Sequence, residues 1–300
     1  MLAILVGIVG LRYLFFAMAH ETTDDAFIQG HIVSVSARLD GHVTGVYVKD
    51  NQWVEKGDSL AEIDPNDFKV SADLAAAQVA MAEADVERSL AQVGQAAVEA
   101  KRAEKDYNRY RKLFDANGGV TEQQIDNTAA AAQSAAVMLE AANKEVNAAR
   151  ARVVQAKAAY NQAQLNLSYT KICAPQSGRV TNKAVEAGEY IRTGQPLLMI
   201  VPREVWVVAN FKETQLKNMK VGQPVKIKVD AYPHRKFTGH IDSIQSGTGA
   251  VFSLLPAENA TGNYIKVVQR VPVKIVFDED PNETKMLSPG MSVLPEVKVK

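Results

Sequence analysis

The residues that could carry out chemistry are few and scattered along the chain. None of the five histidines has the spacing to a second ligand that metal sites show. The single cysteine, Cys173, lies in the apolar stretch 171–175 and is expected to be a small buried side chain without a disulfide partner. No nucleophile elbow, phosphate loop or dinucleotide-binding fingerprint occurs. The sequence therefore predicts no catalytic residue, no metal site and no bound cofactor.

Length and charge narrow the class of protein further. The chain has 300 residues, with 34 Lys and Arg against 34 Asp and Glu. A balanced charge gives no electrostatic footprint for nucleic acid or another polyanion. The length indicates about two domains. Because the sequence predicts no catalytic or metal site, the function has to be inferred from the predicted helices, strands and repeats.

The stretch 65–169 repeats every seven residues, which is the signal of a coiled coil. In its second half, large apolar and small residues alternate along one seam. That seam is Ile125, Thr128, Ala132, Ala135, Leu139, Ala142, Val146, Ala149, Val153, Ala156, Tyr160, Ala163 and Leu167. The first half carries a weaker version, namely Val79, Ala82, Val86, Ser89, Val93, Ala96, Ala100, Ala103, Tyr107, Tyr110 and Phe114. The pattern predicts two long helices packed against each other.

Helix-capping signals set the ends of these helices. Asp64-Pro65 is a typical start, 117–119 (Asn-Gly-Gly) is a typical stop, and 121–124 (Thr-Glu-Gln-Gln) is a capping box. Each helix has roughly 48 residues and spans about 70 Å. Two such helices joined by a short turn form an antiparallel hairpin that must project from the protein as a rod.

An internal repeat flanks the hairpin. Residues 41–63 align without a gap with residues 178–200 at an offset of 137, and glycines and apolar residues coincide. The repeat predicts two halves (41–64 and 170–201) of one lipoyl-like β-sandwich, split by the hairpin. A cofactor-carrying arm is disfavoured, because about 100 residues of helix replace the turn that would present the modified lysine.

The remaining stretches predict further β-structure. Residues 202–300 contain short strands and one small helix (213–219), as expected for a small β-barrel. Pro272 indicates an edge strand or a bulge. Residues 27–39 read as one strand after an acidic linker, so 20–40 is taken as linker plus first barrel-associated strand. The predicted fold is thus α+β: membrane anchor, split sandwich with helical hairpin, and barrel.

The first 19 residues are apolar apart from Arg12 and predict a single transmembrane anchor. The alternative is a cleaved signal peptide, because Ala17-Met18-Ala19 has the form of a cleavage site. Both interpretations place the rest of the chain outside the cytoplasm.

This layout resembles the HlyD family of membrane fusion proteins, and within it the EmrA-type multidrug-export branch. The stretches that carry the resemblance are 23–27 (TDDAF), 50–58 (DNQWVEKGD), 205–216 (VWVVANFKETQL), 252–263 (FSLLPAENATGN) and 267–273 (VVQRVPV). The lack of room for an extra membrane-proximal domain agrees with that branch. The resemblance implies a periplasmic adaptor in a Gram-negative bacterium, anchored in the inner membrane and assembled as a trimer or hexamer.

The resemblance also implies partners. The adaptor would link an inner-membrane major facilitator drug antiporter to a TolC-like outer-membrane channel. One alternative is a HlyD-family adaptor for an ABC or other transporter that exports a different cargo. Another is a structural coiled-coil protein of the envelope.

Two groups of residues are implied as contact sites. In the family, the hairpin tip docks on the channel through Arg, then Leu four residues on, then Ser seven residues further. Arg109 and Leu113 fit this pattern, whereas the hydroxyl falls one residue late on Thr121, after Gly118 and Gly119. The alternative is that Arg109 and Leu113 are ordinary helix residues and Thr121 only an N-cap. In the loop 246–264, Phe252, Leu254 and Leu255 either contact membrane or transporter, or fold onto the barrel.

Overall fold

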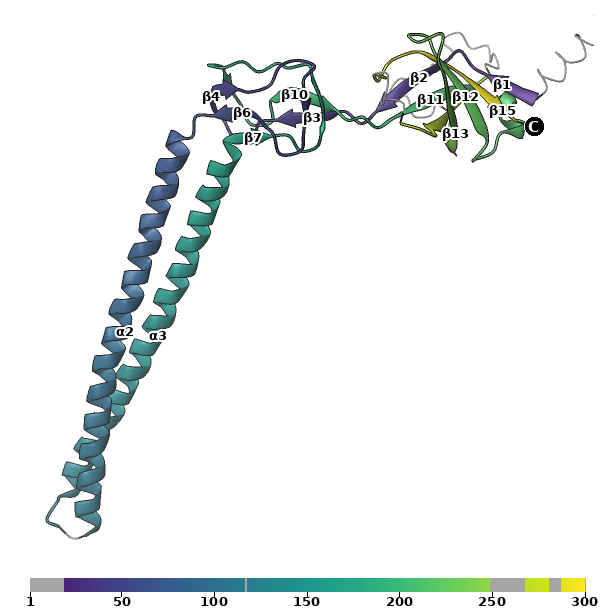
Figure 1. Cartoon of the computed structure of the whole chain (residues 1–300). Helices are drawn as coiled ribbons and strands as arrows, with labels where there is room; N and C mark the ends of the chain where they lie inside the picture. The colour runs from purple at the N-terminus through teal and green to yellow at the C-terminus, as the bar shows by residue number, and fades with distance from the viewer. Residues whose placement is uncertain (1–18, 117, 249–267, 281–286, 300) are drawn as a thin grey trace, which may run out of the picture.

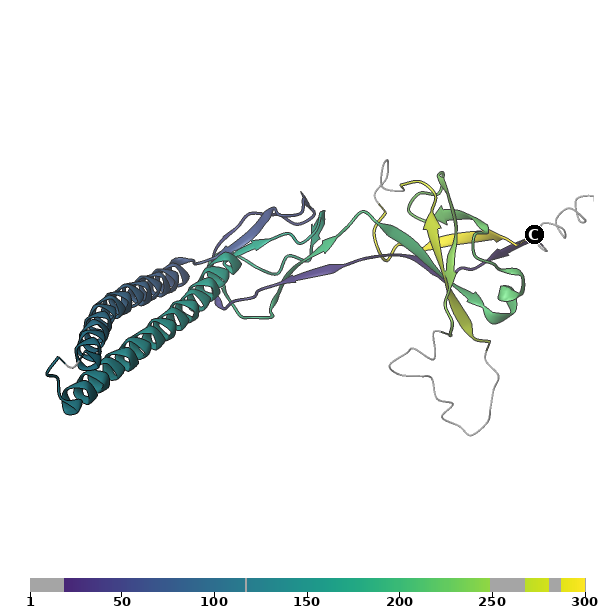
Figure 2. The same ribbon diagram turned by 90° about the horizontal axis from the view of Figure 1, so that it is seen from below.

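The computed structural model describes residues 19–116, 118–248, 268–280 and 287–299. A helical rod, a β-sandwich and a β-barrel follow one another, with the rod at one end and the barrel at the other (Figure 1). Figure 2 shows that two adjacent chain segments join the sandwich to the barrel. No described helix has both the length and the apolar composition to cross a membrane, and the predicted anchor lies outside the described residues apart from its last residue.

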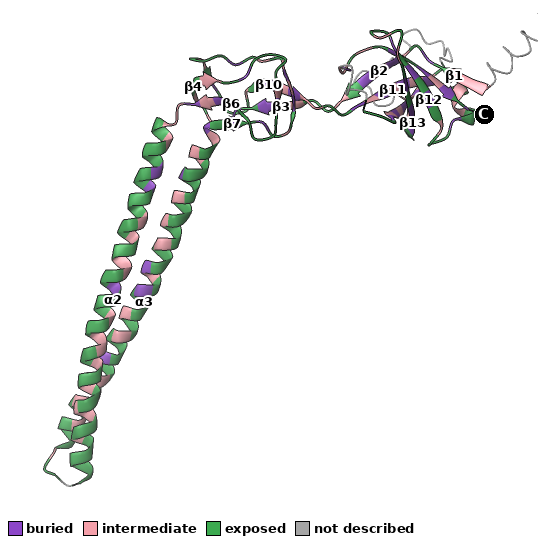
Figure 3. Ribbon diagram, in the orientation of Figure 1, coloured by how far each residue is buried: buried purple, intermediate pink, exposed green. Residues whose placement is uncertain are grey.

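The rod is a hairpin of α2 (Asn66–Asp115) and α3 (Glu122–Tyr169). The predicted seam is confirmed, because each of its residues on α3 is buried or half-buried, with Val146 and Ala149 among the most buried. The predicted seam residues on α2 are also buried or half-buried, except for Phe114 near the tip, which is 42% exposed. Figure 3 shows buried and half-buried residues along the facing sides of two otherwise exposed helices. Small side chains on this seam let the helices pack closely.

The ends of the hairpin also follow the sequence signals. The predicted capping box forms, since the N–H of Gln124 donates to Thr121 Oγ1 and the N–H of Thr121 donates to Gln124 Oε1. At the other end of the hairpin, Asp64 Oδ1 accepts the N–H of Asn66, the first residue of α2. These side chains satisfy N–H groups that have no partner within the helix.

The sandwich has two four-stranded sheets built by exchange between the two repeats. In one half, strands begin at residues 41, 53 and 59; in the other, at 178, 190 and 196, each 137 positions later. The first half supplies β4 (Gly41–Val46), β5 (Trp53–Val54) and β6 (Ser59–Ile63), and the second β8 (Gly178–Thr181), β9 (Tyr190–Ile191) and β10 (Pro196–Val201). The sheet orders are β3-β10-β8-β5, with β3 at Val33–Ser36, and β7-β6-β4-β9, with β7 at Lys171–Cys173. Each half thus completes its sheet with the short strand of the other.

Cys173 corrects one prediction. It is exposed, whereas its neighbours Ile172 and Ala174 are buried in the sandwich core. Side chains alternate between the two faces of a strand, so the apolar neighbours take the inner face and the cysteine points outward.

The barrel is a seven-stranded antiparallel sheet in the order β1-β15-β12-β13-β14-β11-β2. Its strands are β1 (His20–Thr22), β2 (Ala26–Gly30), β11 (Val205–Lys212), β12 (Pro224–Val229), β13 (Lys236–Ile244), β14 (Arg270–Phe277) and β15 (Val293–Lys298), with a short 3-10 helix, η1, at Glu213–Asn218. Hydrogen bonds between Ile28 and the 290–291 turn bring β2 back beside the start of β15. Fully buried Phe211, Ile227 and Ile275 fill the interior. The prediction of a small closed barrel is confirmed.

One further prediction is wrong in detail, and another is right in one of its two alternatives. The single strand expected at 27–39 is two strands, β2 in the barrel and β3 in the sandwich, and the expected linker 21–25 is bonded into the barrel. Pro272 lies in an interior strand, since β14 pairs with both β11 and β13. Its carbonyl accepts the N–H of Gln245, and β13 carries an irregularity between Ile241 and Ser243 on that side. The predicted edge position is therefore wrong, whereas the irregularity in β13 agrees with the predicted bulge.

Candidate functional site

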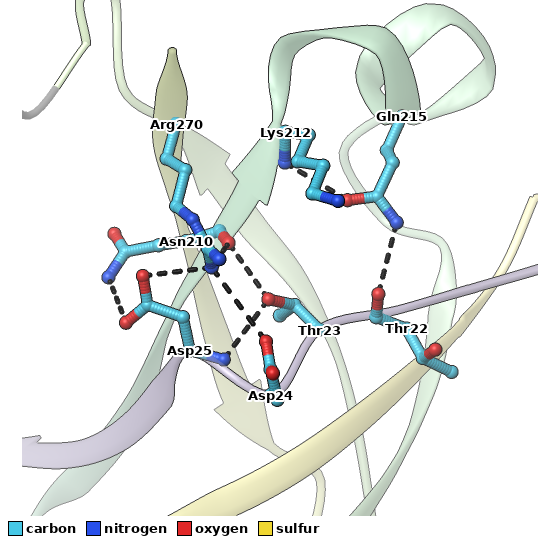
Figure 4. Close-up of polar contacts among 8 residues, drawn as sticks. All are labelled: Thr22, Thr23, Asp24, Asp25, Asn210, Lys212, Gln215 and Arg270. Atoms are coloured by element: carbon cyan, nitrogen blue, oxygen red, sulfur yellow. Dashed lines mark hydrogen bonds and ion pairs between the residues drawn. The ribbon is translucent and has the colours of Figure 1, made fainter. Parts of the chain in front are cut away.

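The segment 20–25, which we call the strap, joins the start of the described chain to the barrel (Figure 4). Its first residues form β1 and pair with β15. Thr23 is buried, and its hydroxyl donates to the carbonyl of Asn210 at 2.9 Å while accepting the N–H of Asp25 at 3.2 Å. The strap is therefore part of the barrel and not a free tether.

An ion pair strengthens the end of the strap. Asp25 lies 2.9 Å from Nη1 of Arg270 on β14, and its other carboxylate oxygen accepts the side-chain N–H of Asn210 at 3.1 Å. The backbone of Asn210 also donates to the carbonyl of Asp25 at 2.8 Å. Hydrogen bonds that involve a charged partner are stronger than neutral ones. Together with the donation of its N–H to Thr23, Asp25 is thus held by four contacts.

Gln215 on η1 holds the start of the strap. Its amide group donates to the carbonyl of Thr22 at 3.0 Å and to Glu21 Oε2 at 2.9 Å. The amide oxygen accepts the N–H of Lys212 at 3.0 Å, which fixes the orientation of the Gln215 side chain. A force applied to the chain before residue 20 is therefore transmitted to β11, β14, β15 and η1 together.

Sequence reasoning noted the stretches 23–27, 205–216 and 267–273 but did not join them into a site. The structure brings together Thr23 and Asp25 from the first, Asn210 from the second and Arg270 from the third. The hydrogen bond from Thr23 to Asn210 spans 187 positions of sequence, and the ion pair between Asp25 and Arg270 spans 245. The available signal was Asn210, a polar residue within the otherwise apolar stretch 205–211.

The junction between barrel and sandwich carries a second set of contacts. The guanidinium of Arg203, on the segment before β11, lies 4.6 Å from the ring centroid of Trp53 in the sandwich. Trp206 has the ammonium of Lys274 5.3 Å from its ring centroid and His31 against its edge. Cation–π contacts of this kind favour one orientation over others. The contact of Arg203 with Trp53 joins the connecting segment to the sandwich, whereas Trp206 and Lys274 both belong to strands of the barrel.

At the hairpin tip, Arg109 and Leu113 lie one turn apart on α2 and line one shallow hollow. Lys105, Asn108 and Lys112 line the same hollow. Leu113 is 44% exposed, and Arg109 is paired with Asp106 at 2.6 Å. The tip therefore presents an apolar side chain within a basic surface.

The turn that follows depends on glycine. The N–H of Gly118 donates to the carbonyl of Leu113 at 2.8 Å, and a Cβ at Gly118 would lie 2.9 Å from that oxygen. Gly119 has a φ of +75°, in the region that favours glycine. Thr121 starts α3, where its hydroxyl oxygen accepts an N–H as the N-cap. The structure thus brings Arg109 and Leu113 together and gives Thr121 a capping role.

The other candidate site residues are not among those that the structure describes. Phe252, Leu254 and Leu255 lie outside the described residues. Within the described ranges, no cluster of three or more histidine, cysteine or acidic side chains could hold a metal ion. The strap, the junction and the tip are therefore the places where function can be argued from structure.

Comparison with known proteins identifies the class. Residues 31–203 match the family model of the membrane fusion protein barrel-sandwich hybrid domain (RND MFP), and residues 204–298 match the AAEA-like β-barrel domain. The first match alone covers more than half of the chain. The chain belongs to the membrane fusion protein family.

Several known proteins are similar to this chain in sequence or in fold. This membrane fusion protein is 36% identical to the multidrug export protein EmrA of Escherichia coli K12, over 98% of this chain and 80% of that protein. It is 35% identical to the fatty acid resistance protein FarA of Neisseria gonorrhoeae, over 92% of this chain and 75% of FarA. The crystal structure of MacA from Actinobacillus actinomycetemcomitans has the same fold, with a TM-score of 0.62 and 21% identity over 94% of this chain and 81% of MacA.

These findings confirm the resemblance drawn from the sequence, including its EmrA-type branch. They also support the prediction that the protein is not an enzyme, because the family consists of structural linkers in efflux pumps. The membrane fusion protein fold with its β-domains and helical hairpin is confirmed as well.

Proposed function

We propose that this membrane fusion protein is the periplasmic adaptor of a tripartite efflux pump. It links an inner-membrane major facilitator drug antiporter to a TolC-like outer-membrane channel. The observation that carries the proposal is the separation of two ends: the strap (residues 20–25) is bonded to the barrel, while the rod projects from the sandwich at the far side (Figure 1).

The inner-membrane end is the barrel end. Residues 2–19 form a single-pass anchor, and the rest of the chain lies in the periplasm. Few residues separate the anchor from the barrel, because the N–H of Val299 donates to the carbonyl of Ala19 and β1 follows at once. The barrel therefore stays within a few residues of the membrane surface. Phe252, Leu254 and Leu255, which follow β13, contact the transporter or the lipid surface there.

The channel end is the hairpin tip. Arg109 and Leu113 supply a basic and an apolar contact, while Gly118, Gly119 and Thr121 shape the turn beside them. Charged residues at the rim of such a contact favour specificity, and a central apolar side chain supplies affinity. Because one rod cannot enclose a conduit, the adaptor works as a trimer or hexamer.

Cross-linking in cells tests this function. A photo-reactive amino acid at Leu113 is expected to capture an outer-membrane channel, while the same residue at Leu90, on α2 away from the tip and 40% exposed, is not. Purification through the full-length adaptor is expected to recover a major facilitator antiporter. Recovery of an ABC exporter would favour the alternative adaptor role, and capture of neither partner would contradict the adaptor function.

A further inference from the structure

The barrel carries a tight turn, 220–223, that holds an apolar side chain outward. The N–H of Gln223 donates to the carbonyl of Lys220 at 3.3 Å, and Gly222 has a φ of +86°, in the region that favours glycine. Val221 at the corner of this turn is 64% exposed, whereas Met219 just before it is buried in the barrel core. A single exposed apolar residue is common on protein surfaces, so its surroundings decide whether it has a role.

Hydrogen bonds hold this turn firmly against the barrel. The side chain of Gln223 accepts the N–H of Lys220 at 2.9 Å and donates to the carbonyl of the last residue of η1, also at 2.9 Å. The N–H of Gly222 donates to the carbonyl of Ile241, a fully buried residue of β13, at 2.8 Å. The position of Val221 is therefore set by the body of the barrel.

The turn lies at the end of the barrel where the described chain begins. Lys298 on β15 pairs with His20 on β1, directly after Ala19. The start of β12, which follows the turn, pairs with the same end of β15, since Val225 lies opposite Val297. In Figure 1, β1 and β15 lie at the end of the molecule opposite the rod. The turn therefore faces the side from which residues 2–19 extend.

Three lysines accompany Val221 at this end. They are Lys217 in the last turn of η1, Lys220 in the turn itself and Lys298 at the end of β15, and all three are exposed. Among the residues that the structure describes, none of the three forms an ion pair. We call Lys217, Lys220, Val221 and Lys298 the exit surface.

Carboxylates also lie at this end of the barrel, but two of them contact partners there. Glu21 Oε2 accepts the side-chain N–H of Gln215, and Glu296 Oε1 lies 3.8 Å from Nε2 of His20. Glu213 at the start of η1 is exposed. One exposed carboxylate beside three unpaired lysines leaves the exit surface with a surplus of positive charge.

We propose that the exit surface rests on the lipid bilayer, with its three lysines against the phosphate groups of anionic phospholipids and Val221 at the boundary of the acyl chains. Contacts of this kind combine an apolar side chain that enters the interface with cations that stay at headgroup level. The inference rests on the proposed function, because residues 2–19 have to be the membrane anchor. It deepens that function by naming the partner of this face.

The residue types favour lipid over a protein partner. The cores of protein interfaces are enriched in aromatic residues and arginine and depleted in lysine, whereas the cations of the exit surface are all lysines. Few residues separate this surface from the anchor, so it reaches the bilayer whether or not a transporter is present. A second contact beside the anchor limits the rotation of the barrel and so orients the rod away from the inner membrane.

Fluorescence quenching tests the contact in the full-length chain. In a Cys173→Ser background, Val221→Cys is labelled with a polarity-sensitive fluorophore, and the adaptor alone is inserted into vesicles of equal parts phosphatidylcholine and phosphatidylglycerol. A phospholipid with a spin label on its headgroup is expected to quench this fluorophore, and much less so in vesicles of phosphatidylcholine alone. Leu294→Cys, at an exposed apolar residue of β15, is the matched control and is expected to stay unquenched.

Neutralising the lysines tests the role of charge. Each lysine near an anionic membrane surface is worth roughly fivefold in the binding equilibrium, so Lys217→Gln with Lys220→Gln is expected to remove most of the quenching at residue 221. The control removes two charges elsewhere, by Lys228→Gln with Lys236→Gln. These exposed lysines face each other on β12 and β13. Lys228 pairs with Leu294, four positions before the end of β15 and about 13 Å farther from the anchor. The control pair is expected to leave the quenching unchanged.

Each other result would overturn the proposal. An unquenched label at residue 221 would exclude the membrane contact. Equal quenching in phosphatidylcholine, or an equal effect of both lysine pairs, would exclude recognition of anionic headgroups by this surface. Quenching that needed the major facilitator antiporter would assign the surface to the transporter instead.

Two further readouts separate this proposal from the proposed function. Flotation of the chain with the vesicles reports the anchor, and drug resistance of cells that carry the unmodified chain reports the adaptor. A chain that floats and confers resistance while its label stays unquenched keeps the adaptor function and loses only the exit surface. A chain that does not float contradicts the anchor, and with it both proposals.

Discussion

Asp40 and Thr193 join the two halves of the sandwich through one carboxylate oxygen. The hydroxyl of Thr193 donates to Asp40 Oδ1 at 2.7 Å, and the backbone N–H of Thr193 donates to the same atom. The repeat reproduces the contact 137 positions away, where the N–H of Lys56 donates to the hydroxyl oxygen of Ser177 at 3.0 Å. The residue before the first glycine of each half thus holds a turn of the other half.

The Asp40 contact predicts a pH-dependent effect. The hydrogen bonds from the Thr193 hydroxyl and then from its backbone N–H lower the pKa of Asp40 from its ordinary 3.8. A carboxyl with a lowered pKa in the folded state stabilises the fold above its unfolded pKa and loses that contribution as the pH falls through the folded pKa. Thr193→Val is therefore expected to lower the melting temperature slightly at pH 7, with the difference shrinking below about pH 4. Thr193→Ser keeps the hydroxyl and is expected to match the unmodified protein, and a difference that stayed constant with pH would contradict the assignment.

The strap predicts a loss of barrel stability on removal of one hydroxyl. Thr23→Val keeps the shape of the side chain but removes its donation to the carbonyl of Asn210. The free energy of unfolding is expected to fall by about 1 kcal/mol. Urea unfolding followed by Trp206 fluorescence, in a Trp53→Phe background, measures the barrel separately. Thr22→Val, at an exposed neighbour, is the control and is expected to change little.

Two glycines predict opposite effects of the same substitution. A Cβ on Gly178 would lie 2.6 Å from a methyl group of Ile200 and 2.7 Å from the carbonyl oxygen of Val201, so Gly178→Ala is expected to cost about 2 kcal/mol or more. Gly94 lies inside α2, and no neighbouring side chain comes within 4 Å of the position that an alanine Cβ would take there. Gly94→Ala is therefore expected to add about 0.5–1 kcal/mol. Thermal unfolding measures both changes, and a stabilising Gly178→Ala would mean that the sandwich halves pack less closely.

The hairpin seam predicts a sharp contrast between two valines of α3. Val146 is 5% exposed on the seam, while Val154 is 69% exposed. Val146→Asp places a charge between the helices and is expected to destabilise the hairpin by about 3 kcal/mol, with Leu139→Asp acting in the same direction. Circular dichroism at 222 nm during thermal unfolding measures the loss. Unchanged helicity in Val146→Asp, or an equal loss in Val154→Asp, would count against the observed packing.

The tip predicts a loss of export without loss of fold. Leu113→Asp places a charge at the exposed apolar residue beside Arg109, and is expected to reduce drug resistance to that of cells without the adaptor. The helical signal is expected to stay unchanged, because Leu113 lies outside the seam. Leu90→Asp, at a residue of α2 with similar exposure, is the control. Normal efflux in Leu113→Asp would refute the tip as the docking site.

Sequence patterns predicted the structure correctly where the spacing of residues along the chain is itself the signal. The seven-residue repeat, the capping box at Thr121 and the 137-residue offset each depend on spacing within one stretch, and each is present in the structure. Cys173 shows the limit of this reasoning, because an apolar stretch does not reveal which face of a strand a residue takes. Pro272 shows the same limit, since the sequence left an edge strand and a bulge open, and only the strand order places the proline in an interior strand.

The sequence by itself determined that this protein has a long hairpin inserted in a split sandwich, because helical period and internal repetition are properties of the chain alone. Only the tertiary structure decided which distant segments of the chain pack against each other. The strap is held by Asn210 and Arg270, far away in sequence, and the two halves of the sandwich exchange β5 and β9. Such contacts arise from packing and from satisfying buried polar groups across distant segments, and no local pattern encodes them.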